Sequence, residues 1–305
     1  MMKRKDNISA LIGGLVTLCV LFSLYFNTAG TDSTISVGSK REKGAAAVRY
    51  LPVYSYLGTA ERDESYLMDT AHGGEGYIAV TAKSAEQVRL RLVCPDGTEI
   101  VYNVPNTGLV AYYPLSCGNG TYSIQLLRKL ESETSENLYE RVLEGSCEAA
   151  LFDEFQPFLR PSTYVWFTGY SSCVNAAAQL CSGVSNDDKK IELIKSYICE
   201  TMTYDESLSE REDQGFIRDP DEILARGSGT CLDYAVLTAA MLRSQGIPTK
   251  VVYGLVGQVT DGTHAWNMVY SSARGWFRID LSFADDGILE SYIADDFNYT
   301  DEGWY

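Results

Sequence analysis

The stretch Gly227-Ser-Gly-Thr-Cys231-Leu-Asp-Tyr-Ala235 joins a glycine-rich turn to a cysteine and to the start of an apolar helix. The segment 232–244 has the apolar spacing of an amphipathic helix, and it stops before Gly246. A cysteine in the first turn of a helix lies at the positive end of the helix dipole, which favours the thiolate. The stretch therefore predicts a reactive cysteine, and the alternative is a buried apolar thiol.

Two further polar residues follow the predicted helix on strand-like segments. Residues 264–270 and 276–281 have the pattern of a hairpin, in which we expect Tyr270 to pair with Trp276. With this pairing, His264 and Asp280 are diagonal neighbours on one face, roughly 7–8 Å apart at the backbone. A one-residue slip would move them to opposite faces. The pattern predicts that the imidazole and the carboxylate meet.

A thiol, an imidazole and a carboxylate in this order can carry out nucleophilic acyl transfer. In this hypothesis Cys231 attacks an amide carbon, and its N–H helps to bind the oxyanion. His264 takes the thiol proton and returns it to the departing amine, while Asp280 orients the imidazole. The chemistry needs no cofactor. We expect no metal site, because the chain has no closely spaced cysteine pair.

These motifs also carry a resemblance. The segments Gly229-Thr-Cys-Leu-Asp-Tyr-Ala235, Gly246-Ile-Pro248, His264-Ala-Trp266 and Trp276…Asp280-Leu-Ser282 resemble the transglutaminase-like core of exported bacterial proteins, over roughly residues 165–285. The spacings of 33 and 16 residues between the three reactive positions are part of this resemblance. This sequence departs from the family pattern after Asp280. It has Leu281-Ser282 at the two positions where the family more often has proline and threonine.

The resemblance implies a papain-like α+β fold with a Cys231, His264 and Asp280 triad. It also implies that Tyr204 lies near the cleft, as a secondary candidate for oxyanion or substrate contact. Asp233 and Trp266, both within the matching motifs, are further secondary candidates.

Two functional hypotheses remain open, because the family includes cross-linking transferases, proteases, deamidases and members without demonstrated activity. The first is a cell-surface enzyme that transfers or hydrolyses peptide or protein amides through a thioester, with a cell-wall-associated protein among the possible substrates. The second is a catalytically silent fold that serves as an extracellular binding or structural module. The formal net charge of −16 argues against a nucleic-acid partner.

The N-terminal part predicts export. Residues 1–7 form a basic tail, and residues 8–26 contain no charge and would span roughly 28 Å as a helix, close to a hydrocarbon core. The basic flank stays on the cytoplasmic side, so we expect a single-pass anchor with the bulk of the chain outside. The alternative is a cleaved signal segment followed by secretion. Residues 27–70 are expected to be a tether.

The remaining chain divides into two expected domains. Residues 71–150 alternate in hydrophobicity and turn at Asp96-Gly97, which predicts a small β-sandwich. Residues 151–305 are expected to form the transglutaminase-like catalytic domain. Within the first of these domains, His72 is interpreted as a loop histidine. Within the second, the acidic segment after residue 284 is interpreted as a solvated tail.

The chain contains eight cysteines. Cys19 lies in the apolar segment and Cys231 is the candidate nucleophile. The other six can form three bridges or stay as buried thiols. Buried thiols are favoured, because a chain of this length does not need covalent cross-links.

Overall fold

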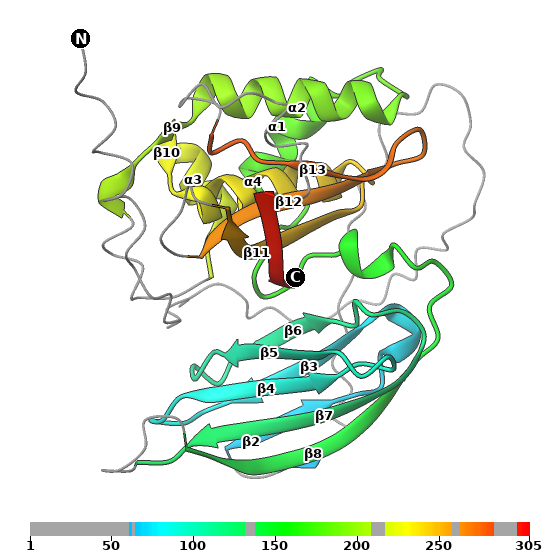
Figure 1. Ribbon diagram of the computed structural model, residues 1–305, viewed down its shortest axis with the longest axis vertical. Coiled ribbons are helices and arrows are strands. Elements are labelled where there is room, and N and C mark those ends of the chain that lie inside the picture. The colour runs from blue at the N-terminus through cyan, green and yellow to red at the C-terminus, as the bar shows by residue number, and fades with distance from the viewer. Residues whose placement is uncertain (1–60, 63–64, 132–137, 209–216, 258–262, 284–297) are drawn as a thin grey trace.

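The computed structural model describes residues 61–62, 65–131, 138–208, 217–257, 263–283 and 298–305, which form two lobes (Figure 1). The strands of the first lobe are β1 (Glu61–Arg62), β2 (Tyr66–Asp69), β3 (Tyr77–Ala82), β4 (Val88–Val93), β5 (Glu99–Val104), β6 (Val110–Pro114), β7 (Gly120–Lys129) and β8 (Tyr139–Ala149). The strands of the second are β9 (Thr203–Tyr204), β10 (Ser228–Gly229), β11 (Thr249–Val256), β12 (His264–Ser271), β13 (Gly275–Ile279) and β14 (Tyr299–Trp304). The helices are η1 (Gly73–Glu75), η2 (Gln156–Phe158), α1 (Ser172–Leu180), α2 (Asp187–Thr201), α3 (Pro220–Arg226) and α4 (Cys231–Ser244).

The first lobe contains two four-stranded sheets, β1-β2-β3-β6 and β5-β4-β7-β8. In β4, Val88, Leu90 and Leu92 are fully buried and the two intervening arginines are half-buried, as the alternation predicted. β4 and β5 pair antiparallel across the predicted Asp96-Gly97 turn. Strands β1 and β2 belong to the first sheet although they precede residue 71, so this sheet begins earlier in the chain than the expected boundary.

Among the described cysteines, Cys94 and Cys117 form a disulfide within the first lobe. The thiols of five others are not disulfide-bonded: Cys147, Cys173, Cys181, Cys199 and Cys231. The favoured prediction of unpaired thiols is therefore wrong for one pair. Sequence spacing does not determine which cysteines meet, because this pair is joined through the folding of separate strands.

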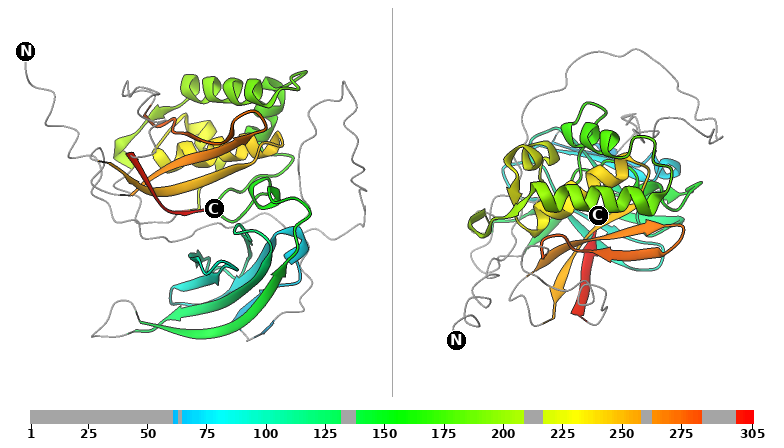
Figure 2. Two further views of the ribbon diagram at one scale, coloured as in Figure 1. Left: turned by 45° about the vertical axis from the view of Figure 1, so that its right-hand side comes forward. Right: turned by 90° about the horizontal axis from the view of Figure 1, so that it is seen from above.

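The second lobe is a mixed α/β unit built around helix α4 and the antiparallel sheet β13-β12-β11-β14. Helices α1, α2 and α4 lie on one side of this sheet, while the first lobe lies on the other (Figures 1 and 2). Every residue from Leu232 to Ser244 is buried, because α4 packs against α1, α2 and α3 as well as against β11 and β12. The first residue of α4 is thus held in a rigid setting.

Strand β14 corrects the prediction of a solvated C-terminal tail. Residues 299–304 pair with β11 from Val256 to Val252, and Val251 and Tyr305 exchange backbone hydrogen bonds of 2.8 and 2.9 Å. The strands approach closely at Gly254, where a Cβ atom would lie 2.0 Å from the Thr300 carbonyl oxygen. The expected acidic tail also included residues 284–297, which lie outside the described residues.

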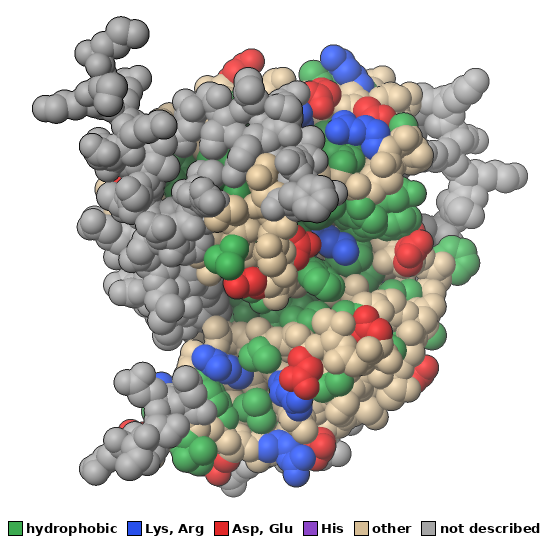
Figure 3. Space-filling model, viewed as in Figure 1, with side chains coloured by type: hydrophobic (Ala, Val, Ile, Leu, Met, Phe, Trp, Pro, Cys, Tyr) green, Lys and Arg blue, Asp and Glu red, His purple; other side chains and the backbone are tan. Residues whose placement is uncertain are grey.

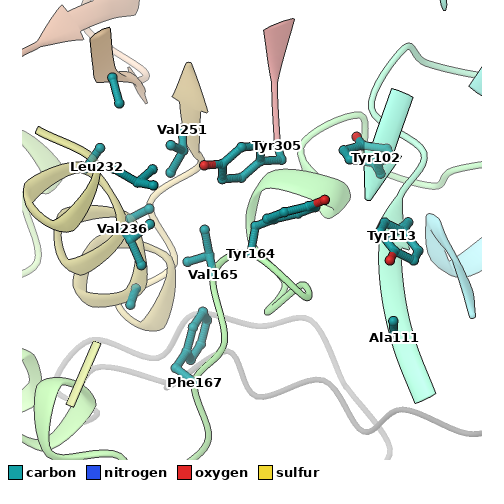
Figure 4. Packing of buried hydrophobic residues seen from close by; sticks show 14 of the residues in the cluster. Tyr102, Ala111, Tyr113, Tyr164, Val165, Phe167, Leu232, Val236, Val251 and Tyr305 are labelled. Carbon is teal, nitrogen blue, oxygen red and sulfur yellow. The ribbon is translucent and has the colours of Figure 1, made fainter. Parts of the chain in front are cut away.

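The two lobes share one hydrophobic core through the segment that follows β8. Thr163 donates its N–H to the Tyr112 carbonyl at 2.9 Å, and its hydroxyl accepts the Tyr112 N–H at 2.7 Å. The Tyr164 hydroxyl donates to the Asn103 carbonyl at 3.0 Å, and its ring lies between Tyr305 and the tyrosines of the first lobe (Figure 4). These contacts fix the first lobe against the second lobe.

No helix among the described residues is long and apolar enough to cross a membrane. The segment 8–26, which is expected to be an anchor or signal, lies outside the described residues, as do the tail 1–7 and most of the tether 27–70.

Candidate active site

Cys231 is the first residue of α4 and is half-buried. As an N-terminal helical residue its N–H has no intrahelical carbonyl to bond, and its thiol lies at the positive end of the helix dipole. Helix α4 starts here because Asp233 accepts the Thr230 N–H at 3.0 Å, which is one half of a capping box. This local chemistry sets the orientation of the cysteine.

Asp233 stabilises the turn before Cys231 through further contacts. Its carboxylate forms ion pairs with Arg218 at 3.3 Å and with Arg226 at 3.1 Å. Burial raises the pKa of Asp233, while the two arginines and the Thr230 N–H oppose that rise. Gly229 fits because a Cβ atom there would lie 2.4 Å from the Asp233 side chain. These contacts give Asp233 a scaffold role, and the expected substrate or oxyanion contact does not follow from them.

Tyr204 lies beside the same turn. β9 and β10 form a short parallel pair in which Tyr204 is opposite Gly229, and the Asp205 N–H donates to the Gly229 carbonyl at 3.0 Å. The Tyr204 ring is half-buried and stacks at 6.4 Å from the ring of Tyr234 on α4. The structure therefore brings Tyr204 next to the segment that carries the nucleophile.

The hairpin β12–β13 has the predicted register, with Tyr270 opposite Trp276 and Asn267 opposite Ile279. Continuing this register brings His264 and Asp280 to one face, where His264 Nε2 lies 2.8 Å from Asp280 Oδ2. Both side chains are at most 3% exposed. The predicted contact between imidazole and carboxylate is confirmed. Five residue pairs between β12 and β13 define the register that produces it.

His264 is enclosed by aromatic rings. Its ring stacks 4.7 Å from Phe283 and 6.2 Å from Trp266, with interplanar angles of 13° and 23°. Burial lowers the pKa of His264, but the charge of Asp280 and hydrogen bonds to Asp280 and Cys231 outweigh it and raise the pKa to about 10. Since Nε2 is engaged by Asp280, Nδ1 is the nitrogen available to the Cys231 thiol. The site therefore favours a protonated imidazole next to the Cys231 side chain.

Asp280 has two additional partners that sequence analysis missed. The Ser282 hydroxyl donates to Oδ1 at 2.7 Å, and the Tyr299 hydroxyl donates to Oδ2 at 3.1 Å. Ser282 belongs to the Leu281-Ser282 pair, where this sequence differs from the family pattern. This difference was the feature of the sequence that pointed to Ser282. Tyr299 comes from β14, and no local pattern connects it to the hairpin.

Trp266 supports the imidazole from behind. It is 1% exposed, stacks on His264, and meets Tyr299 edge-on at a centroid distance of 4.9 Å. A contact between Trp266 and substrate does not follow from this position. Its place in the structure indicates a role in holding the ring of His264.

Among the described residues, one group of potential metal ligands lies close together, formed by Cys94, Asp96 and Cys117. Because the two cysteines are bonded to each other, their sulfur atoms are not thiolate ligands. This group lies in the first lobe, and the arrangement at Cys231 can act chemically through thiol, imidazole and carboxylate alone.

The surface between the lobes is hollowed. Figure 3 shows hydrophobic side chains gathered in the hollow, with acidic and basic side chains at its margins.

A family model covers all three residues of this site. Residues 174–281 match the family model described as the transglutaminase-like superfamily. An uncharacterized protein of Mycobacterium leprae is 26% identical over 175 residues, which cover 54% of this chain and 59% of that protein. The chain thus matches little more than half the length of that relative.

Two solved structures are similar over most of the chain. One is a proposed cysteine protease from Cytophaga hutchinsonii, with 14% identity, a TM-score of 0.41, and coverage of 79% of this chain and 76% of that chain. The other is the periplasmic domain of TgpA from Pseudomonas aeruginosa bound to ethylmercury, with 16% identity, a TM-score of 0.34 and 77% coverage of both chains. Both scores are below 0.5, so no conclusion about this chain rests on them.

Proposed function

Because residues 174–281 belong to the transglutaminase-like superfamily, we propose that this protein is a thiol-dependent enzyme that transfers or hydrolyses acyl groups of peptide or protein amides. Cys231 is the nucleophile, His264 the general base and acid, and Asp280 the group that orients His264. The observation that carries the proposal is the buried His264–Asp280 contact of 2.8 Å, together with the effect of Cys231, at the start of α4, in raising the pKa of His264.

The chemistry follows from these three groups. The Cys231 thiolate forms a bond to the amide carbon, and the departing amine takes its proton from the His264 imidazolium. The product of this half-reaction is a thioester on Cys231. A second amine resolves the thioester by transamidation, whereas water, deprotonated by His264, resolves it by hydrolysis. Access of water to the thioester decides between these outcomes.

We place the activity at the cell surface. The uncharged segment 8–26 with its basic flank supports insertion as a single-pass anchor, with the lobes outside. The Cys94–Cys117 disulfide supports an oxidising compartment, because such bonds persist mainly in exported proteins. A peptide or protein at the cell surface, including one associated with the cell wall, is then the expected partner. Cleavage of residues 8–26 would instead release the protein.

The test is alkylation of the full-length chain, purified in detergent, by iodoacetamide across pH 5 to 10, with labelled cysteines identified by mass spectrometry. We expect Cys231 to react faster than Cys199 near neutral pH by about 10-fold or more, since a thiolate is the reactive form. Cys199 is a matched reference because it is also half-buried and not disulfide-bonded.

The variant His264→Ala should slow labelling of Cys231 and leave Cys199 unchanged. Equal, slow labelling of Cys231 in both proteins would overturn the enzymatic proposal. The fold would then be better explained as an extracellular binding or structural module.

A further inference from the structure

Tyr305 is held rigidly at the end of the described chain. Its N–H and carbonyl pair with Val251, and the carbonyl also accepts a hydrogen bond from the Arg243 guanidinium at 3.0 Å. Its ring lies 4.6 Å from that of Tyr164 and 6.2 Å from that of Tyr253. The residue is 4% exposed. Main chain and ring are therefore fixed, and the hydroxyl is directed by the fold.

The hydroxyl of Tyr305 has no hydrogen-bond partner within the described part of the chain, although it is buried. Figure 4 shows it pointing past Val251 toward Leu232, the second residue of α4 and the neighbour of Cys231. A buried hydroxyl without a partner destabilises the folded protein. Such a group is a candidate for a bond made only when a substrate is present.

Electrostatics connect this hydroxyl to the nucleophile. Burial raises the pKa of Tyr305, Tyr253 raises it further, Arg218 lowers it, and Cys231 raises it. The phenol is therefore protonated at neutral pH and can donate. The charge of Cys231 thus acts on the phenol, whose hydroxyl forms no hydrogen bond with any described residue.

Resting on the proposed function, we infer that Tyr305 is a catalytic residue whose hydroxyl donates to the acyl oxygen during attack by Cys231. The Cys231 N–H is the second donor. Tyr305 lies outside the residues 174–281 that match the family model, so the inference comes from β14 rather than from the resemblance.

The thiolate forms the S–C bond, and the π electrons of the carbonyl move to oxygen, which becomes an oxyanion. Tyr305 and the Cys231 N–H donate hydrogen bonds to it without transferring their protons. When the carbonyl re-forms, the bond to the leaving group breaks, and an amine leaving group takes a proton from the His264 imidazolium.

The experiment compares two reactions of the full-length chain. p-Nitrophenyl acetate acylates a thiolate through an oxyanion, whereas iodoacetamide alkylates it by displacement without one. For Tyr305→Phe we expect acylation to fall about 10²-fold. Alkylation of Cys231 should stay within about twofold, because the thiol–imidazole pair is untouched.

The matched control is Tyr102→Phe. It removes another buried hydroxyl without a hydrogen-bond partner, from the same aromatic cluster but in the first lobe (Figure 4). This variant should change neither rate. Both variants are expected to keep the wild-type melting temperature or exceed it, because an unpartnered hydroxyl contributes no bond.

Three outcomes would overturn the inference. If Tyr305→Phe is acylated at the wild-type rate while Cys231 remains fast to alkylate, the proposed function stands and the role of Tyr305 is refuted. If both reactions slow equally, Tyr305 acts on the thiolate and not on the oxyanion. If wild-type Cys231 is not activated toward iodoacetamide, the proposed function and this inference fail together.

Discussion

Each lobe holds a buried histidine, and the two have similar surroundings. His72 is 2% exposed and His264 is 3% exposed. Nδ1 of His72 lies 3.0 Å from Glu75, and Nε2 of His264 lies 2.8 Å from Asp280. Each imidazole also stacks on an aromatic ring, at 4.6 Å on Tyr77 and at 4.7 Å on Phe283. Burial, a carboxylate and a stacked ring therefore do not by themselves distinguish a catalytic histidine.

The nearby thiols differ in the two lobes. Cys147, close to the turn that carries His72, lies on strand β8 and donates its S–H to the Thr70 carbonyl at 3.2 Å. Burial raises the pKa of Cys147 to about 11, with added contributions from Glu148 and Asp69. Cys231 instead lies at a helix start and interacts with His264. The two lobes therefore differ in where the nearby thiol lies, which is on a strand near His72 and at a helix start near His264.

The largest expected effect contrasts the two histidines directly. His264→Asn should reduce acylation by p-nitrophenyl acetate by about 10³-fold, because the thiol loses its base. His72→Asn should leave that rate within about twofold, since His72 faces carboxylates and not the nucleophile. The measurement is release of p-nitrophenolate by each purified variant. Similar losses in both variants would break the comparison.

A second prediction concerns stability and pH. The pKa of His264 is raised from 6.5 to about 10, so the folded state binds the proton more tightly than the unfolded chain. The corresponding stabilisation is complete below pH 6.5 and is lost as pH rises through about 10. The free energy of unfolding of the wild type should exceed that of His264→Asn by a few kcal/mol at pH 6.

That excess should shrink steadily toward pH 10.5. Urea unfolding of both proteins at several pH values measures it. A difference that stays constant with pH, or grows toward alkaline pH, would contradict a protonated His264 in the folded protein.

The smallest effect tests the support of Asp280. Ser282→Ala removes the 2.7 Å hydrogen bond to Oδ1, while His264 and Tyr299 remain on Oδ2. We expect a loss of about 1 kcal/mol of transition-state stabilisation, or about fivefold in acylation rate. Ser282→Thr, which keeps the hydroxyl, is the matched control and should recover most of the rate. An unchanged acylation rate in Ser282→Ala would show that the hydrogen bond from Tyr299 is sufficient to support Asp280.

Much of the site could be predicted because its pieces are local. The helix start at Cys231 follows from the glycines before it and from the apolar spacing of residues 232–244. The alignment of His264 with Asp280 follows from the period of two in a hairpin with a short turn. Each inference needs only neighbouring residues, and helix or strand periodicity decides the geometry.

The partners that complete the site could not be found in this way. The segment with Tyr299 and Tyr305 contains several acids, which suggested solvation, yet it pairs with β11, which lies more than 40 residues earlier. The pairing of Cys94 with Cys117 was equally hidden. A strand's choice of partner depends on the packing of the whole sheet, and a local sequence pattern does not contain it.

The sequence by itself determined the class of fold and the three candidate residues Cys231, His264 and Asp280, with the last two on one face of a hairpin. Tertiary structure decided that Phe283 and Trp266 enclose His264, that Tyr299 and Ser282 hold Asp280, and that Tyr305 points toward the start of α4. The reason is physical: backbone periodicity fixes which side of an element a residue occupies, but only the packing of distant elements fixes what it meets there.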